Sequence, residues 1–293
     1  MAAKPVVAGT DGSPESVRAV EWAAREAVLR ETSLRIVAVP ALPPRMSTNP
    51  ATRETVAGMI EQAMNRALAA AASDAAEQAP DLAIETQLLA GSPASALVES
   101  ARDASMLVVG SRGAGGFSAM ILGSVSRYAA THAACPVVVV REETMAAHRE
   151  IVVGVRDPVQ SAAALGFAFE EAALRKARLV AVHAVAWSIP AIRPHGEKAG
   201  AEAGSGPGET VGDEDARMEA LLAVWREKYP DVEARWEVVH AHPGRVLAGA
   251  SARADLVVLG RHAPGEAHAP GVGSVTHSVL SHAHGPVASV PGE

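Results

Sequence analysis

Short apolar runs alternate with longer segments whose apolar residues recur at helical spacing, and this alternation organises the whole chain. In the first half, five runs of mainly Val, Leu, Ile and Ala predict strands at 5–9, 33–40, 82–91, 106–110 and 136–141. The segments between them predict four helices, at 13–30, 52–79, 92–104 and 123–133. Strands and helices that alternate in this way indicate right-handed crossovers and a mainly parallel sheet.

Local signals agree with this interpretation. The strand runs are apolar throughout rather than alternating, which is typical of parallel strands buried on both faces. The first helix has a capping serine, Ser13, and Pro14 at its first helical position. Aromatic residues make up only 3% of the chain, so the core must consist of Ala, Val, Leu and Ile, as in helices packed on buried strands.

The second half of the chain repeats the first. The segments ASMLVVGSRGAGGF and ADLVVLGRHAPGEA match in residue type, with Gly110 and Gly260 separated by 260 − 110 = 150 residues. Gly9 and Gly154 align with an offset of 154 − 9 = 145, so the second copy is 150 − 145 = 5 residues longer between these points. Internal repeats of this kind predict two similar units in tandem.

We therefore predict an α/β protein with two domains, 1–144 and 149–293. Each should have a doubly wound, mainly parallel five-stranded sheet with helices on both faces, as in Rossmann-like folds. The acidic, Gly- and Ala-rich segment 192–216 of the second copy lacks a hydrophobic pattern, and we expect it to be a mobile surface insertion.

Composition excludes several classes of function. The formal charge is −7 and the Lys and Arg residues are scattered, which argues against nucleic acid as a partner. No apolar stretch approaches the roughly 20 residues that span a bilayer, and no signal peptide precedes the first strand, so we expect a cytoplasmic protein without membrane contact. Cys135 is the single cysteine, and we expect it to be a small buried residue rather than a reactive thiol.

The glycine-rich loop after the fourth strand is a candidate phosphate site. Gly110 and Gly113 would let the backbone approach a ligand, and Gly123 and Ser124 begin a helix whose free N–H groups suit phosphate. Asp11 follows the first strand, and its carboxylate could accept hydrogen bonds from ribose hydroxyls. The alternative is that these are ordinary turn and cap residues, with Asp11 bonding its own turn.

The spacing of this loop resembles a known family. Gly110, two residues, Gly113, nine residues and then Gly123–Ser124 match the G-x2-G-x9-G-[S/T] signature of ATP-binding universal stress proteins. VVAGTDGS near the start and HAACPVVVVR near residue 140 also look like this family, and the resemblance covers both halves of the chain. It implies a fold related to the adenine nucleotide alpha hydrolases.

The resemblance also implies the residues that would hold ATP, with Mg²⁺ arriving as its counterion. Asp11 would meet the ribose or adenine, and Val39 would meet adenine through its backbone. The predicted site comprises Thr10, Asp11, Val39, Gly110, Arg112, Gly113, Gly123, Ser124, Val125 and Ser126.

The second copy departs from this pattern. Arg156 stands where the first copy has Asp11, Asp157 comes one residue late, and Ala263 replaces the second glycine. We therefore predict a weaker second nucleotide site, formed by Asp157, Gly260, Gly273, Ser274, Val275 and Thr276.

Three classes of function fit these features. The first is a regulatory ATP-binding protein of the stress response, with at most slow hydrolysis, because the first copy offers no evident general base or paired carboxylates for a catalytic Mg²⁺. The second is an interaction or dimerisation module without nucleotide function. The third, an enzyme that transfers a phosphoryl or nucleotidyl group, is supported only by analogy of fold.

Two further expectations concern metal and assembly. Histidines gather near the C-terminus, at His262, His268, His277, His282 and His284, but the repeat relates His282 to His132, and we predict no metal site there. The last strand of each copy presents an open edge that invites pairing, and a tandem chain can pair its two copies with each other. The family resemblance implies such a pseudo-dimer, and a homodimer of chains.

Overall fold

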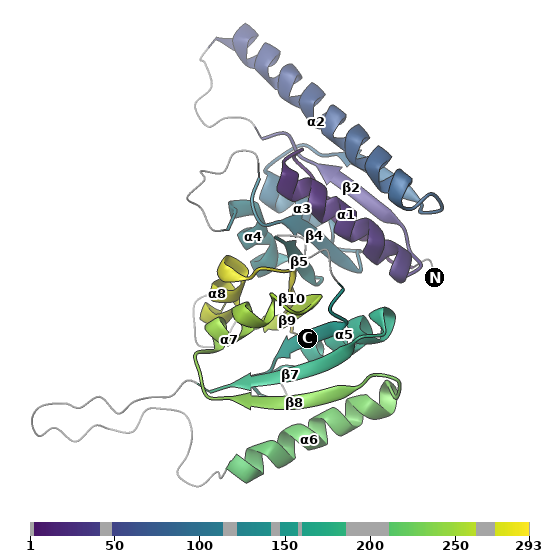
Figure 1. Ribbon diagram of the computed structural model, residues 1–293. Coiled ribbons are helices and arrows are strands. Elements are labelled where there is room, and N and C mark those ends of the chain that lie inside the picture. Colours follow the sequence, from purple (N-terminus) through teal and green to yellow (C-terminus); the bar gives the residue numbers. More distant parts are fainter. Residues whose placement is uncertain are drawn as a thin grey trace, which may run out of the picture.

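A single ten-stranded sheet forms the centre of the molecule (Figure 1). The computed structural model describes residues 3–41, 49–113, 122–141, 147–157, 160–185, 211–261 and 273–292. The strands follow one another across the sheet in the order β3-β2-β1-β4-β5-β10-β9-β6-β7-β8. Each half of the chain therefore contributes five neighbouring strands.

The elements lie where the hydrophobic pattern places them. The first half contains β1 (Val6–Gly9), α1 (Pro14–Leu29), β2 (Leu34–Ala38), α2 (Pro50–Gln78), β3 (Ile84–Leu88), α3 (Pro93–Ser100), β4 (Met106–Gly110), α4 (Ser124–His132) and β5 (Val137–Val140). The second half contains β6 (Glu150–Gly154), α5 (Ala162–Arg175), β7 (Arg178–Ala184), α6 (Val211–Lys228), β8 (Ala234–Val239), α7 (Pro243–Ala250), β9 (Leu256–Arg261), α8 (Ser274–His282) and β10 (Val287–Pro291).

Two local predictions can be compared with helix ends. Ser13 caps α1 as predicted, because its side chain accepts a hydrogen bond from the Ser16 N–H, and Pro14 begins the helix. The predicted surface insertion was too long at its C-terminal end, because α6 begins at Val211 and residues 211–216 are helical. Residues 192–210 of that insertion lie outside the described part of the chain.

The two halves join through their last strands. β5 and β10 run antiparallel, with Val137 opposite Ser289 and Val139 opposite Val287, whereas the other strand pairs are parallel. The predicted pairing of the two copies is therefore observed, and it merges the two five-stranded sheets into one. We call this β5–β10 junction the seam.

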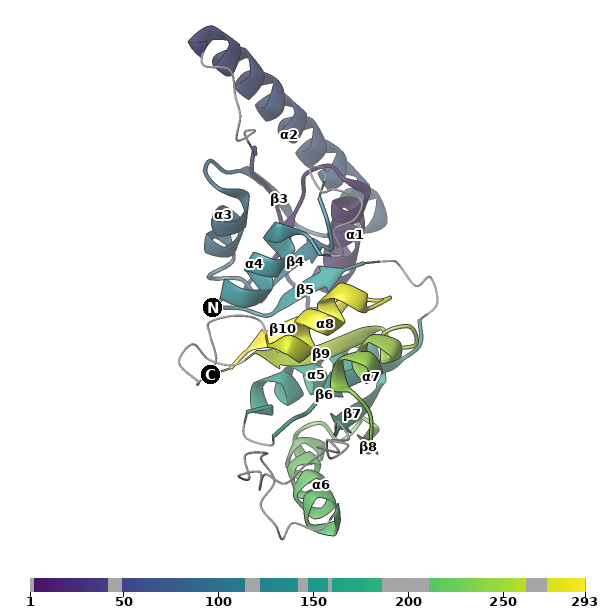
Figure 2. The same cartoon turned by 90° about the vertical axis from the view of Figure 1, so that its left-hand side faces the viewer.

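Helices cover both faces of the sheet (Figures 1 and 2). Buried residues of α1, α2, α5 and α6 pack in one core cluster, and those of α3, α4, α7 and α8 pack in the other. Alternate residues of β5 face the two layers, with Val138 in the first cluster and Val139 in the second. Both clusters contain residues of both halves, so each core continues across the seam.

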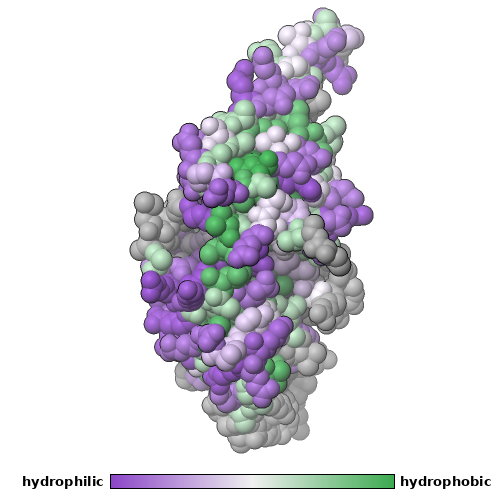
Figure 3. Space-filling model, turned by 90° about the vertical axis from the view of Figure 1, so that its right-hand side faces the viewer, coloured by the Kyte–Doolittle hydropathy of each residue, from purple (hydrophilic) through white to green (hydrophobic). Residues whose placement is uncertain are grey.

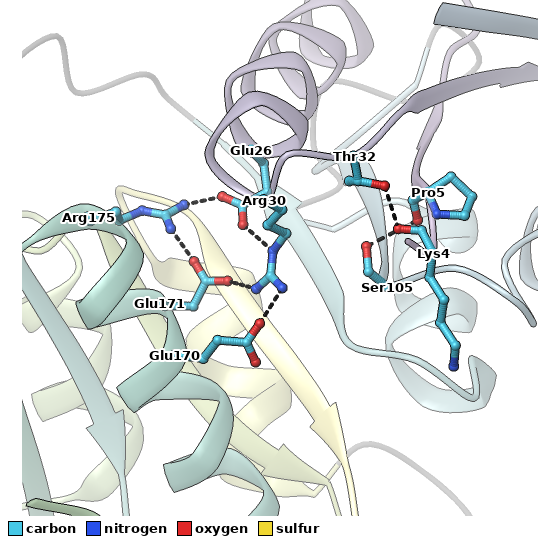
Figure 4. Close-up of polar contacts among 9 residues, drawn as sticks. All are labelled: Lys4, Pro5, Glu26, Arg30, Thr32, Ser105, Glu170, Glu171 and Arg175. Atoms are coloured by element: carbon cyan, nitrogen blue, oxygen red, sulfur yellow. Dashed lines mark hydrogen bonds and ion pairs between the residues drawn. The ribbon is translucent and has the colours of Figure 1, made fainter. Parts of the chain in front are cut away.

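A buried ionic cluster joins α1 to α5 on one face of the seam (Figure 4). Glu26 and Arg30 of α1, and Glu171 and Arg175 of α5, are i, i+4 pairs related by the repeat, since 171 − 26 = 145 and 175 − 30 = 145. Arg30 Nε and Arg175 Nη2 each lie 2.5 Å from a Glu26 oxygen, and both guanidinium groups contact Glu171. Both carboxylate side chains are 0% exposed, and their charges are paired within the cluster, which the neighbouring Glu170 extends.

The surface is mostly polar, with limited apolar exposure. Figure 3 shows one face, on which a strip of hydrophobic residues lies between hydrophilic ones. At the C-terminal end of α1, Val28 is 50% exposed and Leu29 is 39% exposed. Among the described residues, no helix combines the length and the hydropathy that a membrane crossing requires.

Candidate functional site

The candidate site lies between two neighbouring strands, β1 and β4, whose following helices cover opposite faces of the sheet. β1 and β4 are adjacent parallel strands, with Val6 opposite Met106 and Ala8 opposite Val108. After β1 the chain enters α1 on one face of the sheet, and after β4 it leads to α4 on the other face. Ligands in doubly wound sheets bind at such a switch point, beyond the carboxyl ends of the strands.

The turn after β1 holds the Asp11 carboxylate in a fixed place. Asp11 Oδ1 accepts a hydrogen bond from the Ser13 N–H at 3.0 Å, so the simpler interpretation, that Asp11 bonds its own turn, is correct for one of its oxygens. Gly12 has a φ of 78°, a conformation that favours glycine. Thr10 is buried, and its hydroxyl lies 3.2 Å from that of Ser16. The turn therefore fixes the carboxylate instead of leaving it free to rotate.

Gly113 brings the loop after β4 next to this carboxylate. A Cβ atom at Gly113 would lie 2.4 Å from Asp11 Oδ2, closer than real Cβ contacts. A side chain at this position would therefore have to displace the Asp11 carboxylate. Asp11 and Gly113, predicted to serve one ligand, are neighbours in space.

Gly110 has a packing role in addition to the ligand role that its motif predicts. A Cβ atom there would lie 2.7 Å from the backbone carbonyl carbon and oxygen of Glu15, in the first turn of α1. The glycine therefore allows α1 to pack closely on β4, and its approach to a ligand stays a prediction.

The N-terminus of α4 is held at the end of β4. The Gly123 N–H donates to Ser111 O at 2.8 Å, and the buried Ser126 hydroxyl donates to Gly110 O at 2.6 Å. Gly123 is the N-cap residue and has no side chain with which to cap the helix, and Ser124 is exposed. The first turn of α4 therefore presents backbone N–H groups at the site, as anion-binding helix termini do. The Ser126 hydroxyl itself is engaged with the backbone.

Arg112 follows β4, and it forms an ion pair with Glu15 of α1, the helix that follows β1. Its Nη2 lies 3.2 Å from Oε1 of Glu15, and its side chain is 41% exposed. Glu15 also lies 3.9 Å from Arg18, so one carboxylate is shared by two guanidinium groups. Val39 directly follows β2 and is buried on the other side of β1.

Two residues of this region were missed from the sequence. Glu15 contacts Arg112 across 97 residues (112 − 15 = 97), and nothing in the local pattern indicates such a contact. Ser16 stands three residues after the capping Ser13, and its hydroxyl accepts from the Asp11 N–H at 3.3 Å. A serine in the first turn after a capping serine was the signal available for it.

The corresponding region of the second half is built differently. α5 begins eight residues after Gly154 (162 − 154 = 8), whereas α1 begins five after Gly9 (14 − 9 = 5). In this half a Cβ atom at Gly260 would meet its nearest neighbours, including Gln160 O, at an ordinary 3.7 Å. Asp157 Oδ1 accepts from the Gln160 N–H at 3.1 Å.

The remaining residues of the predicted second site resemble the first copy only at the helix start. Gly273 is the N-cap of α8, Ser274 is exposed, Val275 is partly buried, and Thr276 is buried like Ser126. Ala263, the substitution in the glycine motif, lies outside the described residues.

The described residues present no cluster of histidine, cysteine and carboxylate side chains that could hold a metal ion. His262 and His268 lie outside the described residues, whereas His282 Nδ1 lies 2.8 Å from Ser278 O, as His132 Nδ1 lies 2.9 Å from Tyr128 O. The two histidines therefore occupy equivalent positions, each in the last turn of its helix. Burial raises the pKa of the Cys135 thiol to about 11, as expected for an inert, buried cysteine.

The family model and the similar proteins that match this chain all indicate the same family. Residues 2–141 and 148–291 each match the model of the universal stress protein family. A universal stress protein of Mycolicibacterium smegmatis is 33% identical over 300 residues, covering 97% of this chain and 96% of the relative. One from Mycobacterium tuberculosis is 34% identical over 303 residues, covering 96% and 93%.

The fold is similar to a solved structure as well. The crystal structure of a universal stress protein from Archaeoglobus fulgidus superposes with a TM-score of 0.71 at 17% identity, covering 99% of this chain and 97% of that one. At this identity the likeness concerns the fold.

Proposed function

Because the chain belongs to the universal stress protein family, with one family domain in each half, we propose that it binds an adenine nucleotide, ATP, in its first domain. The site would lie at the carboxyl ends of β1 and β4. Occupancy would regulate the conformation or assembly of a stress-response protein, and chemical turnover would be slow at most.

One observation carries this proposal: the Asp11 carboxylate and the first turn of α4 lie at the same switch point. A Cβ atom at Gly113 would lie 2.4 Å from Asp11, while the first turn of α4, whose N-cap Gly123 has no capping side chain, is tied to the end of β4 by the Gly123–Ser111 hydrogen bond. A carboxylate suits ribose hydroxyls and repels phosphate, whereas a helix N-terminus attracts phosphate. The two ends of one nucleotide therefore have separate, suitable partners.

The residues present fit such a ligand. Asp11 would accept from the ribose, the backbone N–H groups of Ser124 and Val125 would donate to the phosphates, and Arg112 would add positive charge beside them. Bound Mg²⁺ would neutralise part of the triphosphate charge. In the second domain, Arg156 replaces the ribose-binding carboxylate and α5 begins later, so we propose a weaker site there.

Calorimetric titration of ATP into nucleotide-free protein with Mg²⁺ tests the proposal. We expect a stoichiometry near one and about 10- to 100-fold weaker binding by Asp11→Asn, because charge-assisted hydrogen bonds contribute about 1.5–3 kcal/mol. Gly113→Val should abolish binding, since its side chain would occupy the space beside Asp11. Asp157→Asn is the matched control and should leave the first site unchanged.

A second ligand separates ribose recognition from phosphate recognition. 2′,3′-Dideoxy-ATP lacks both ribose hydroxyls, so it should bind wild type about as weakly as ATP binds Asp11→Asn. Absence of any heat or thermal shift with ATP in the wild type would refute the proposal and favour the interaction module. A cytoplasmic location and a homodimer of chains stay predictions, and sedimentation analysis would test the latter.

A further inference from the structure

The helix whose N-terminus faces the proposed phosphates is held at its other end by the second domain. α4 has nine residues, about 13 Å of helix at 1.5 Å per residue. Its N-terminal end is tied to β4 through the Gly123–Ser111 and Ser126–Gly110 hydrogen bonds. Its C-terminal carbonyl groups receive donors from beyond the seam.

Arg261 supplies most of this contact. It ends β9, and its Nη1 donates to Ala130 O at 2.9 Å while its Nη2 donates to Ala133 O. Ser289 of β10 also donates its hydroxyl to Ala130 O, at 3.1 Å. A cation is favourable at a helix C-terminus, where the carbonyl groups lack intrahelical partners.

Arg261 is also unusual within its own domain. It occupies the position that Ser111 holds in the first copy, since 261 − 111 = 150, directly after the retained Gly260. Its side chain leaves the end of β9 and crosses the seam to α4, and burial lowers its pKa. Taking a guanidinium out of water is costly, so its contacts with α4 offset a desolvation penalty.

A matching contact runs in the other direction across the seam. Arg141, which follows β5, donates through Nη1 to Leu280 O at 2.8 Å and to Ser281 O, in the last turn of α8. Figure 2 shows α4 and α8 on the same face of the sheet, on either side of β5 and β10. Each domain therefore uses an arginine to hold the short helix of the other.

We propose that Arg261 is a positioning residue for the first nucleotide site, acting across the seam through α4 on the phosphates alone. This inference rests on the proposed function. With its C-terminal carbonyl groups bound to Arg261, α4 would keep its first turn aligned beside Ser111 and Arg112, and the added positive charge complements the helix dipole. Asp11, which would hold the ribose, lies in the turn after β1 and not in α4.

The test compares ATP with adenosine, which has the same base and ribose but no phosphate, on wild type and Arg261→Ala. We expect the Kd for ATP to rise about three- to tenfold, as charges at helix ends contribute on the order of 1 kcal/mol. The Kd for adenosine should change less than about twofold. Arg261→Lys keeps the charge without the paired donors and should restore part of the ATP affinity.

Arg141→Ala is the matched control, because it removes the reciprocal contact with α8 and leaves that with α4. It should bind ATP like wild type. An equal loss of affinity for ATP and adenosine in Arg261→Ala would show that the whole site had loosened, and it would overturn the inference. Unchanged affinity for both ligands would also overturn it. If wild type binds neither ligand, the proposed function fails.

Hydrogen exchange measured without nucleotide distinguishes a failure of the positioning role from a failure of the proposed function. Arg261→Ala should speed exchange of the α4 amides and not those of α8, and Arg141→Ala should do the reverse. Unchanged α4 exchange in Arg261→Ala would overturn the positioning role even in a protein that binds ATP.

Discussion

Replacing Arg30 with methionine tests how the ionic cluster between α1 and α5 stabilises the protein. Arg30 contacts Glu26, Glu170 and Glu171, and its side chain is only 11% exposed (Figure 4). Its guanidinium also lies 5.7 Å from the centre of the Phe167 ring. Methionine retains a flexible apolar side chain against that ring but removes the charge and its hydrogen bonds.

The expected loss of stability follows from the two buried carboxylates that remain when Arg30 is removed. Among the described residues, Glu26 and Glu171 would keep Arg175 alone as a positive partner, and both carboxylate side chains are 0% exposed. Removing one partner of a buried ion pair costs about 3–5 kcal/mol, because the other charge remains buried and uncompensated. We therefore expect the free energy of unfolding to fall by about that amount at pH 7.5.

The effect should depend on pH in a defined direction. Burial, reinforced by the neighbouring Glu26, raises the pKa of Glu171 to about 7 from its ordinary 4.5. The native state therefore holds this proton more tightly than the unfolded state does, so the stabilising contribution is full below about pH 4.5 and is lost as the pH rises through about 7. The loss in Arg30→Met should shrink at pH 5, where protonation neutralises a stranded carboxylate.

Urea unfolding followed by circular dichroism at pH 5 and pH 7.5 measures both effects. Arg35→Met is the matched control, because Arg35 pairs with Glu85, which is 60% exposed, and such surface pairs contribute about 0–1 kcal/mol. A loss at pH 7.5 no larger than that of Arg35→Met, or a loss that grows at pH 5, would refute the reasoning.

Two further predictions concern packing and thiol chemistry. Gly110→Ala should lower the free energy of unfolding by about 1–3 kcal/mol, because its Cβ would lie 2.7 Å from the Glu15 carbonyl, whereas Gly260→Ala, with 3.7 Å of space, should stay within about 0.5 kcal/mol of wild type. Equal losses in thermal unfolding would contradict this. Cys135, whose pKa burial raises to about 11, should react slowly with a disulfide reagent at pH 8 and fully in urea, and fast native labelling would disprove its inertness.

The candidate site was predictable as far as its signals are local. The spacing of Gly110, Gly113 and Gly123 placed the loop, and Ser13 marked the start of α1 beside it. The roles of single residues within it were harder to predict. Gly110 serves the packing of α1, and the hydroxyl of Ser126 is bound to the backbone, because both depend on a contact with a distant segment.

The sequence by itself determined the order of strands and helices, the parallel sheet of each half and the repeat. Each of these follows from hydrophobic period and cap residues within a few turns of chain. It also indicated that the two last strands would pair, since an open edge requires cover.

Only the tertiary structure decided how tightly the two halves are coupled. The contacts of Arg175 with Glu26 and of Arg261 with α4 join residues 149 and about 130 positions apart, and neither pair has a local signature. Their partners become neighbours because β5 and β10 align the two sheets, which brings α1 beside α5 and β9 within reach of α4. The glutamate and arginine pairs of α1 and α5 are thereby buried and paired across the seam.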